Sequence, residues 1–134
     1  MQLVLASSSA YRKKQLETLG LPFTCARPDI DESRINNENA HDMALRLAEE
    51  KARAVTKKIP NSLIIGSDQT VAFGEQILGK PGSFDAAIKQ LQLLRGQTVI
   101  FYSAVALINT ANDSVQKQVI ETQVRYRHLS DVQI

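Results

Sequence analysis

The residues that first suggest chemistry are three neighbouring serines, Ser7, Ser8 and Ser9, with Arg12 and Lys13 shortly after them. The serines separate an apolar run at residues 3–6 from a basic segment that is compatible with a helix. A loop between a strand and a helix exposes unpaired backbone N–H groups at the positive end of the helix dipole, which favours an anion. The sequence therefore suggests a phosphate site here, and the alternative is that the serines only cap a surface helix.

Two carboxylates also follow expected strands. Asp68 ends the largely apolar run at residues 62–68, and Glu32 lies in a polar stretch after another short strand. Carboxylates with basic side chains nearby suit a divalent cation bound to a phosphoanhydride, because the cation neutralises some phosphate oxygens and the basic side chains hold the others. The alternative is that each charge is simply solvated or ion-paired. The candidate basic residues are Arg12, Lys13, Lys51 and Lys80.

The two later lysines differ in context. Lys51 borders the apolar stripe of an expected helix, so its side chain either points inward or belongs to a solvated face that is rich in charge. Lys80 lies between Gly79 and Pro81 in an evident loop, without other charges beside it.

The elements that must position these residues follow from periodicity and from turn residues. Apolar spacing and capping residues predict helices at 10–19, 40–58 and 84–95, and the helix at 40–58 has the clearest amphipathic pattern. Residues 62–68 read as a strand buried on both faces, followed by a hairpin at 69–78. Further strands are expected at 3–6, 22–26, 97–108 and 115–127, the last two as an antiparallel hairpin.

Composition bounds the class of protein. The chain has 134 residues, of which 43% are hydrophobic and 22% charged, and this is enough for one globular domain over residues 1–134. Its net charge of +2 is too small to indicate a nucleic-acid partner. A single cysteine, Cys25, in an apolar strand position fits a reduced, cytoplasmic setting, and no apolar run is long enough for a membrane span. Residues 130–133 resemble a capping box that begins a helix, so we expect the domain to lack its C-terminal part.

Several blocks in order resemble the Maf family of nucleotide pyrophosphatases. They are residues 5–9 with Arg12, Asp31-Glu32, residues 46–52, residues 65–69 and residues 79–81. The resemblance covers essentially the whole chain, and five blocks in order are far more specific than a serine loop or a Gly-Lys-Pro segment alone.

The resemblance implies an elongated α/β fold in which a mixed sheet, flanked by helices, has two lobes that enclose a nucleotide-binding cleft. It implies hydrolysis of a nucleoside triphosphate between the α and β phosphates, with Mg²⁺ or Mn²⁺, and it allows a homodimer. By matching position, Asp68 would be a general base or metal ligand and Glu32 its partner in binding metal or water. Lys51 and Lys80 would contact phosphate, together with Ser7, Ser9, Arg12 and Lys13.

Two positions bear on the base. Tyr11 and Gln69 stand where members of the 7-methyl-GTP type have an aromatic residue and a glutamine, whereas members that act on dTTP and UTP have arginine and threonine. An aromatic face attracts the cationic 7-methylguanine ring, although Tyr11 could instead only pack on the helix surface. We therefore expect 7-methyl-GTP as substrate. The alternatives are a pyrophosphatase for dTTP, UTP or a modified nucleotide, and a non-catalytic nucleotide-binding regulator linked to cell division.

Overall fold

The computed structural model of the chain describes residues 1–57, 59–79 and 82–133 and has a mixed α/β fold. Its elements in chain order are β1 (Gln2–Ala6), α1 (Ala10–Glu17), β2 (Thr24–Ala26), α2 (Ala40–Thr56), β3 (Ser62–Phe73), β4 (Gln76–Leu78), α3 (Phe84–Leu94), β5 (Thr98–Asn109) and β6 (Ser114–Arg125). The expected fold class is therefore confirmed. Among the described residues, no helix is both long enough and apolar enough to cross a bilayer.

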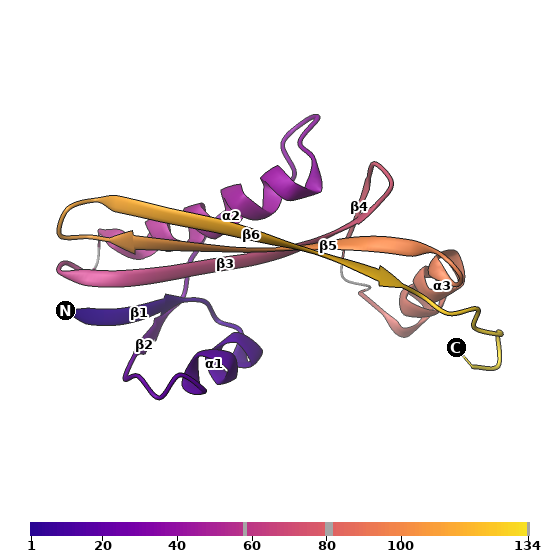
Figure 1. Cartoon of the computed structure of the whole chain (residues 1–134), viewed down its shortest axis with the longest axis horizontal. Helices are drawn as coiled ribbons and strands as arrows, with labels where there is room; N and C mark the ends of the chain where they lie inside the picture. The colour runs from indigo at the N-terminus through magenta and orange to yellow at the C-terminus, as the bar shows by residue number, and fades with distance from the viewer. Residues whose placement is uncertain (58, 80–81, 134) are drawn as a thin grey trace.

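One mixed sheet runs the length of the elongated molecule (Figure 1). The strand order is β2-β1-β3-β5-β6, and β4 pairs with β3 outside this path. β1 is parallel to β2 and β3, whereas the pairs β3–β4, β3–β5 and β5–β6 are antiparallel. Strands β1 and β2 and helix α1 lie at one end of the molecule, and β4 and α3 lie at the other (Figure 1). The long strands β3, β5 and β6 connect the two ends.

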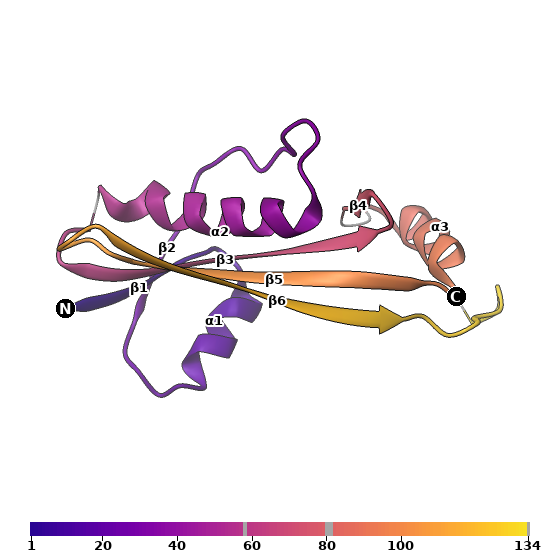
Figure 2. The same ribbon diagram turned by 45° about the horizontal axis from the view of Figure 1, so that its top comes forward.

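Helix α2 covers one face of the sheet, and α1 lies on the opposite side (Figure 2). Asn39 caps the start of α2 by accepting a hydrogen bond from the Asp42 amide at 2.8 Å, and Ser83 caps α3 in the same way. The face of α2 that meets the sheet is small and apolar. Its buried contacts with the sheet include Ala44, Ala48, Ala52 and Val55 from the helix and Val4, Ile64, Ala104, Ala106 and Ile108 from the strands.

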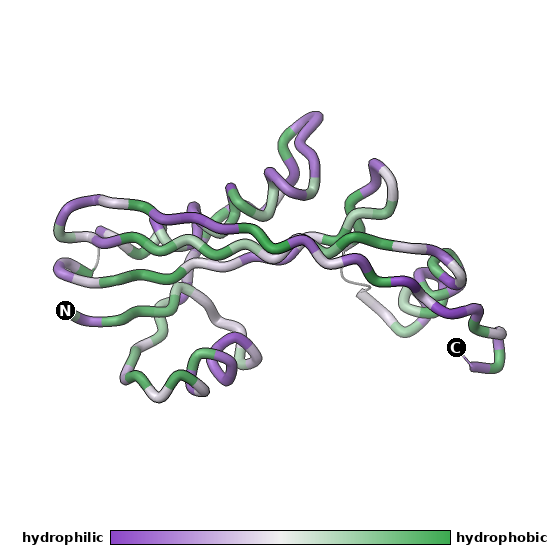
Figure 3. Tube along the Cα trace, viewed as in Figure 1, coloured by the Kyte–Doolittle hydropathy of each residue, from purple (hydrophilic) through white to green (hydrophobic). Residues whose placement is uncertain are grey.

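Apolar residues concentrate in β1, β3 and β5, whereas much of β6 is hydrophilic (Figure 3). β6 forms an edge of the sheet, and its side chains are exposed or half-buried along its whole length. The core of the molecule is therefore the layer between α2 and the central strands.

Strand β3 differs from its sequence-based prediction. It continues through Phe73 instead of ending at Asp68, and only then turns at Gly74 and Glu75 into β4, so the expected hairpin is present. The prediction that this strand is buried on both faces is wrong. Its residues alternate between buried and half-buried, because α2 covers one face only. The other helix and strand bounds differ from prediction by only a few residues at their ends.

Residues 130–133 show part of the expected capping box. The Ser130 amide donates to Gln133 Oε1 at 2.9 Å, and residues 131–133 form a turn.

Candidate active site

Lys51 on α2 joins two of the candidate carboxylates. Its Nζ lies 2.8 Å from Asp68 Oδ1 on β3 and 3.0 Å from Glu32 Oε1 in the loop that precedes α2. Lys51 and Asp68 are only 7% and 8% exposed, whereas the Glu32 side chain is 59% exposed. The view of Lys51 as part of a solvated helix face is therefore wrong, because its side chain points toward the sheet.

The closeness of α2 to β3 makes this contact possible. Gly66 faces α2 two residues before Asp68, and a Cβ atom there would overlap the Ala48 carbonyl oxygen and lie 2.8 Å from the Ala52 amide nitrogen. Only glycine fits between the backbones of helix and strand at this point. Because side chains two apart on a strand share a face, Asp68 also points toward α2, within reach of the lysine that precedes Ala52.

The serine loop leads from the end of β1 to the start of α1. Ser9 is the N-cap of α1 and accepts a hydrogen bond from the Arg12 amide at 3.3 Å, so the helix capping considered as an alternative to a phosphate site is present. Ser7 is buried, and its Oγ accepts from the Ser9 amide at 3.0 Å. Within the part of the chain that the structure describes, neither Arg12 nor Lys13 forms an ion pair. Both cations at this helix start therefore lack an acidic partner among those residues.

The middle of β3 has a free edge beside this loop. β1 pairs with β3 as far as the register Leu5–Ile65, and β4 begins to pair with it only at Val71. Residues 66–70 thus have β5 on one side and no described strand on the other. Asp68 lies in this interval, just past the point where β1 ends and the serine loop begins. The structure therefore places the serine loop and the Glu32–Lys51–Asp68 cluster at one edge of the sheet.

Gln69 lies on the opposite face of β3 from Asp68, because adjacent strand residues point to opposite faces. Its Nε2 donates to Ser103 Oγ on β5 at 3.1 Å, and the side chain is exposed. Tyr11 is 71% exposed on α1, which lies on the same side of the sheet as Gln69 (Figure 2). The two specificity candidates therefore do not join the Lys51 cluster, and Lys80 lies outside the described residues.

The residues present fit a divalent cation in one particular way. In the described ranges no three His, Cys, Asp or Glu side chains converge as a metal cage. Glu32 and Asp68 do converge, on the Lys51 ammonium. Two carboxylates are what Mg²⁺ uses when substrate phosphates and water supply its other ligands. The cluster therefore fits a cation that arrives with a phosphorylated substrate better than a cation held by protein alone.

Sequence reasoning overlooked Arg46, which it grouped with the solvated charges of α2. The guanidinium binds Glu38 through Nε at 2.7 Å and Nη2 at 2.9 Å, and Nη1 binds Glu50 at 3.0 Å. Its hydrogen bonds hold the pKa of the Glu38 carboxyl below its usual value, and Glu38 in turn raises the pKa of Arg46. The four-residue spacing of Arg46 and Glu50 was visible in the sequence, whereas the contact with Glu38 across a loop was not.

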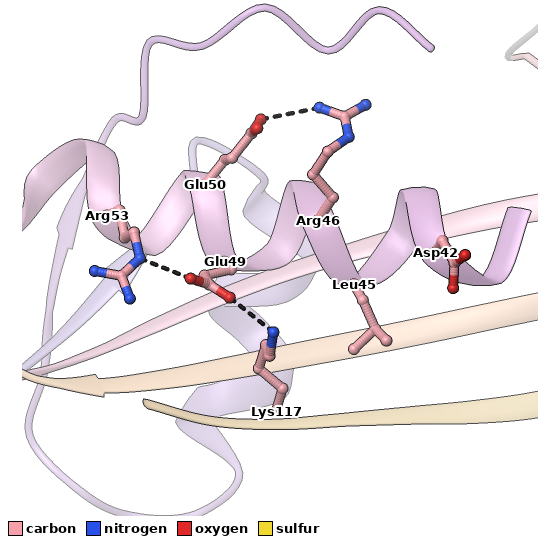
Figure 4. Close-up of a pocket in the computed structure, with 7 residues that line it drawn as sticks. All are labelled: Asp42, Leu45, Arg46, Glu49, Glu50, Arg53 and Lys117. Atoms are coloured by element: carbon pink, nitrogen blue, oxygen red, sulfur yellow. Dashed lines mark hydrogen bonds and ion pairs between the residues drawn. The ribbon is translucent and has the colours of Figure 1, made fainter. Parts of the chain in front are cut away.

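A depression along α2, bounded on one side by Lys117 of β6, carries several further charged residues (Figure 4). It is lined by Asp42, Leu45, Arg46, Glu49, Glu50, Arg53 and Lys117. Glu49 binds Arg53 at 2.7 Å and Lys117 at 2.9 Å, and these bonds lower the pKa of Glu49. Arg46, Arg53 and Lys117 each have an acidic partner, so the cations that line this surface are already paired, and none of the predicted site residues lies on it.

Comparison with known proteins gives a consistent picture. A family model described as "Maf-like protein" matches residues 2–134. The chain is 53% identical over 133 residues to a protein of Aromatoleum aromaticum named 7-methyl-GTP pyrophosphatase, covering 99% of this chain and 69% of that protein. It is 48% identical to a protein of the same name from Nitrosococcus oceani, covering 98% of this chain and 66% of the relative. The chain thus spans about two thirds of the length of these curated relatives.

Two solved structures share the fold. The Ham1 protein of Staphylococcus aureus matches with a TM-score of 0.57 at 19% identity, covering 92% of this chain and 70% of that one. A HAM1 protein from Coxiella burnetii matches with a TM-score of 0.51 at 20% identity, covering 92% of this chain and 73% of that one. At this level of identity the likeness concerns the fold alone.

Proposed function

The chain belongs to the Maf-like protein family, and from that premise we propose that it is a nucleoside triphosphate pyrophosphatase that acts on 7-methyl-GTP. The resemblance drawn from its sequence blocks is confirmed by the family match. The proposed reaction cleaves the α–β phosphoanhydride and releases a nucleoside monophosphate and pyrophosphate. The observation that carries it is the buried Lys51 ammonium between Asp68 and Glu32 at the free edge of β3.

Asp68 is proposed as the general base or as a metal ligand. One carboxylate oxygen, Oδ1, accepts the hydrogen bond from Lys51, which fixes the orientation of the group. Because that bond fixes the carboxylate, it also fixes the direction of the second oxygen, Oδ2, which can accept a proton from the attacking water. Glu32 binds the same ammonium through Oε1 at 3.0 Å and is proposed as the second oxygen donor. Lys51 itself offers positive charge to the phosphate chain once the substrate is bound.

The serine loop is proposed to bind the rest of the phosphate chain. Ser7 and Ser9 order the turn that precedes α1, and Arg12 and Lys13 lie in the first turn of that helix. Charged donors at a helix start favour an anion over water. Lys80 is proposed as a further phosphate contact on the resemblance alone, since it lies outside the described residues.

Glu32 and Asp68 would hold Mg²⁺ or Mn²⁺ together with the substrate. A divalent cation bound there would neutralise negative charge on the phosphate oxygens of the substrate. Which of the two cations serves is part of the test below.

Tyr11 and Gln69 support 7-methyl-GTP over the alternatives. A cationic methylated guanine gains from stacking on an exposed tyrosine, and Gln69 offers both a donor and an acceptor to a purine edge. Tyr11→Arg is therefore expected to lower kcat/KM for 7-methyl-GTP more than for dTTP. An unchanged ratio of the two values would remove Tyr11 from the specificity argument.

We propose further that residues 1–134 act as a single domain in the cytoplasm, where nucleoside triphosphates are found, and that a second copy of the chain is a partner. One sheet shared by both ends of the molecule supports the single domain. The edge strand β6 supports self-association, because its outer edge meets no other strand among the described residues. Analytical ultracentrifugation would report a dimer, and a monomer at every concentration would contradict this part.

The test of the reaction is pyrophosphate release from 7-methyl-GTP, GTP, dTTP, UTP and ITP with Mg²⁺ or Mn²⁺. We expect a clear preference for 7-methyl-GTP. Asp68→Asn is expected to abolish release while leaving nucleotide binding largely intact. A matched control is Asp113→Asn, the same change in the exposed β5–β6 turn, where the side chain is 80% exposed. Preference for dTTP or UTP would overturn the substrate, and absence of release from every nucleotide would overturn the enzyme in favour of a binding or regulatory protein.

A further inference from the structure

Glu32 lies in a segment without regular structure. Residues 27–39 connect β2 to α2 and contain neither a helix nor a strand. A carboxylate on such a segment keeps its place only if the segment is held by side-chain contacts, because it has no ladder of backbone hydrogen bonds. Among the described residues, the exposed Glu32 side chain forms one ion pair, to Lys51 at 3.0 Å. The backbone on either side of Glu32 therefore needs a separate anchor.

Arg46 supplies contacts to this segment at two points. Its Nη2 donates to the Ser33 carbonyl oxygen at 2.9 Å, one residue after Glu32. Near the end of the segment, the same guanidinium donates to both carboxylate oxygens of Glu38, from Nε to Oε2 at 2.7 Å and from Nη2 to Oε1 at 2.9 Å. A planar guanidinium fixes direction as well as distance when it binds a carboxylate with two bonds. Both ends of the stretch 33–38 are thereby held against α2.

Short hydrogen bonds within the segment make it one unit. The Ser33 amide donates to Asp31 Oδ1 at 2.9 Å, which closes a turn around Glu32. Arg34 Nε donates to the Glu38 carbonyl oxygen at 2.7 Å, and the Glu38 amide donates to the Ile35 carbonyl oxygen at 3.0 Å. A force on Ser33 or Glu38 is therefore transmitted to the backbone of Glu32. The Arg46 and Glu38 side chains are only 19% and 9% exposed, so water competes poorly for their bonds.

We infer that Arg46 is a positioning residue for Glu32: by binding Ser33 and Glu38 it fixes the loop that presents the Glu32 carboxylate beside Lys51 and Asp68. This inference rests on the proposed function for its activity readout, but the anchoring of the loop stands on the contacts alone. Arg46 acts through Glu32, and its hydrogen bonds within the described residues go to Ser33, Glu38 and Glu50, not to any candidate phosphate-binding residue. Glu50, on the next turn of α2, binds the remaining Nη1 at 3.0 Å and keeps the guanidinium turned toward the loop (Figure 4).

The kinetic test compares Arg46→Ala with Arg53→Ala. Arg53 is on the same helix and is also paired with a glutamate four residues away, Glu49 at 2.7 Å, but has no hydrogen bond or ion pair to residues 27–39. Arg46→Ala is expected to lower kcat about 10²-fold, a loss that a displacement of about 1 Å in the active site can cause, with KM for the nucleotide changed far less. Arg53→Ala should keep the kcat of the parent. Equal losses in both variants would overturn the inference.

A second comparison uses Glu32→Ala as background. If Arg46 acts through Glu32, Arg46→Ala should cause no further loss of kcat once Glu32 is gone, because the two residues then belong to one unit. Full additivity of the two losses would show that Arg46 serves another purpose. Arg46→Lys keeps the charge without the two-bond geometry and is expected to recover only part of the activity.

The last readout needs no catalysis. Trypsin cleavage after Arg34 should be faster in Arg46→Ala than in the parent chain and unchanged in Arg53→Ala, because only the first change frees the loop. Should Arg46→Ala fail to fold, Glu38→Gln weakens the same contact and is expected to give a smaller increase. If the parent chain hydrolyses no nucleotide, the proposed function fails while the cleavage rates still decide the loop anchor. Equal cleavage rates in folded parent, Arg46→Ala and Glu38→Gln proteins would overturn it.

Discussion

Replacing Lys51 by methionine removes the charge between the two carboxylates and keeps most of the side-chain length. The Lys51 and Asp68 side chains are each 9% exposed, and their charged atoms are 2.8 Å apart. At that distance the Coulomb attraction is roughly 6 kcal/mol for an effective dielectric constant of about 20. Removing one partner of a buried pair typically costs about 3–5 kcal/mol, because the other charge stays buried without compensation. Glu32 adds little to this cost, since its exposed carboxylate can turn to water.

We therefore expect Lys51→Met to lower the free energy of unfolding by about 3 kcal/mol at pH 7. In a domain of this size such a loss corresponds to a fall in Tm of roughly 10 °C. Urea and thermal unfolding followed by circular dichroism would measure both quantities. Lys117→Met is the matched control, because Lys117 also pairs with a glutamate, at 2.9 Å, but is 45% exposed. Its loss should cost no more than about 1 kcal/mol.

The double variant Lys51→Met/Asp68→Asn separates the charge from the packing. Removing both charges leaves no uncompensated ion, so the double variant should be more stable than Lys51→Met alone. The reasoning is refuted if Lys51→Met unfolds within about 0.5 kcal/mol of the parent, or if the double variant is less stable than the single one.

Three further changes probe other parts of the structure. Gly66→Ala places a Cβ atom against the backbone of α2 and should lower the free energy of unfolding by about 2 kcal/mol or more, measured by urea unfolding. An unchanged free energy would mean that α2 and β3 lie farther apart than described. Arg46 lowers the pKa of Glu38 in the folded protein below the ordinary value of 4.5, so the stabilisation from this pair is present above about pH 4.5 and is lost as the pH falls through the lower folded pKa. The difference in unfolding free energy between the parent and Glu38→Gln should therefore be constant near neutral pH and shrink in acid. A difference that grows in acid would contradict this sign. Calorimetry should show that Mn²⁺ binds the protein at least about tenfold more tightly when a non-hydrolysable nucleoside triphosphate is present, and Asp68→Asn should remove this gain. Equally tight binding of Mn²⁺ without nucleotide would contradict a metal site that the substrate completes.

The sequence was sufficient for most elements because their signals are local. The apolar spacing of α2 and the capping residues Asn39 and Ser83 depend only on residues close in the chain. The Gly74-Glu75 turn likewise predicted the β3–β4 hairpin. The burial of β3 was predicted wrongly, because a continuous apolar run does not reveal how many helices cover the sheet.

The candidate site was only partly accessible to the same reasoning. Glu32, Lys51 and Asp68 were each named from sequence, but their meeting depends on the approach of α2 to Gly66, which is a tertiary feature. Arg46 was overlooked because its partners Ser33 and Glu38 lie in an irregular loop with no periodicity to read.

The interruption on one edge of β3 also sets the width of the sheet. Beside β1 the sheet is five strands wide along the path β2-β1-β3-β5-β6, but at residues 66–70 only β3, β5 and β6 lie side by side among the described strands. Helix α2 braces this narrow part of the sheet from one face: Thr70 Oγ1 donates to the Ala40 carbonyl oxygen at 2.6 Å, and Gly66 meets the helix backbone at Ala48 and Ala52. The strand that lacks a described neighbour on one edge is therefore held by a helix instead. Asp68 lies between these two points of contact, so its carboxylate has a fixed helix on one side and an open sheet edge on the other.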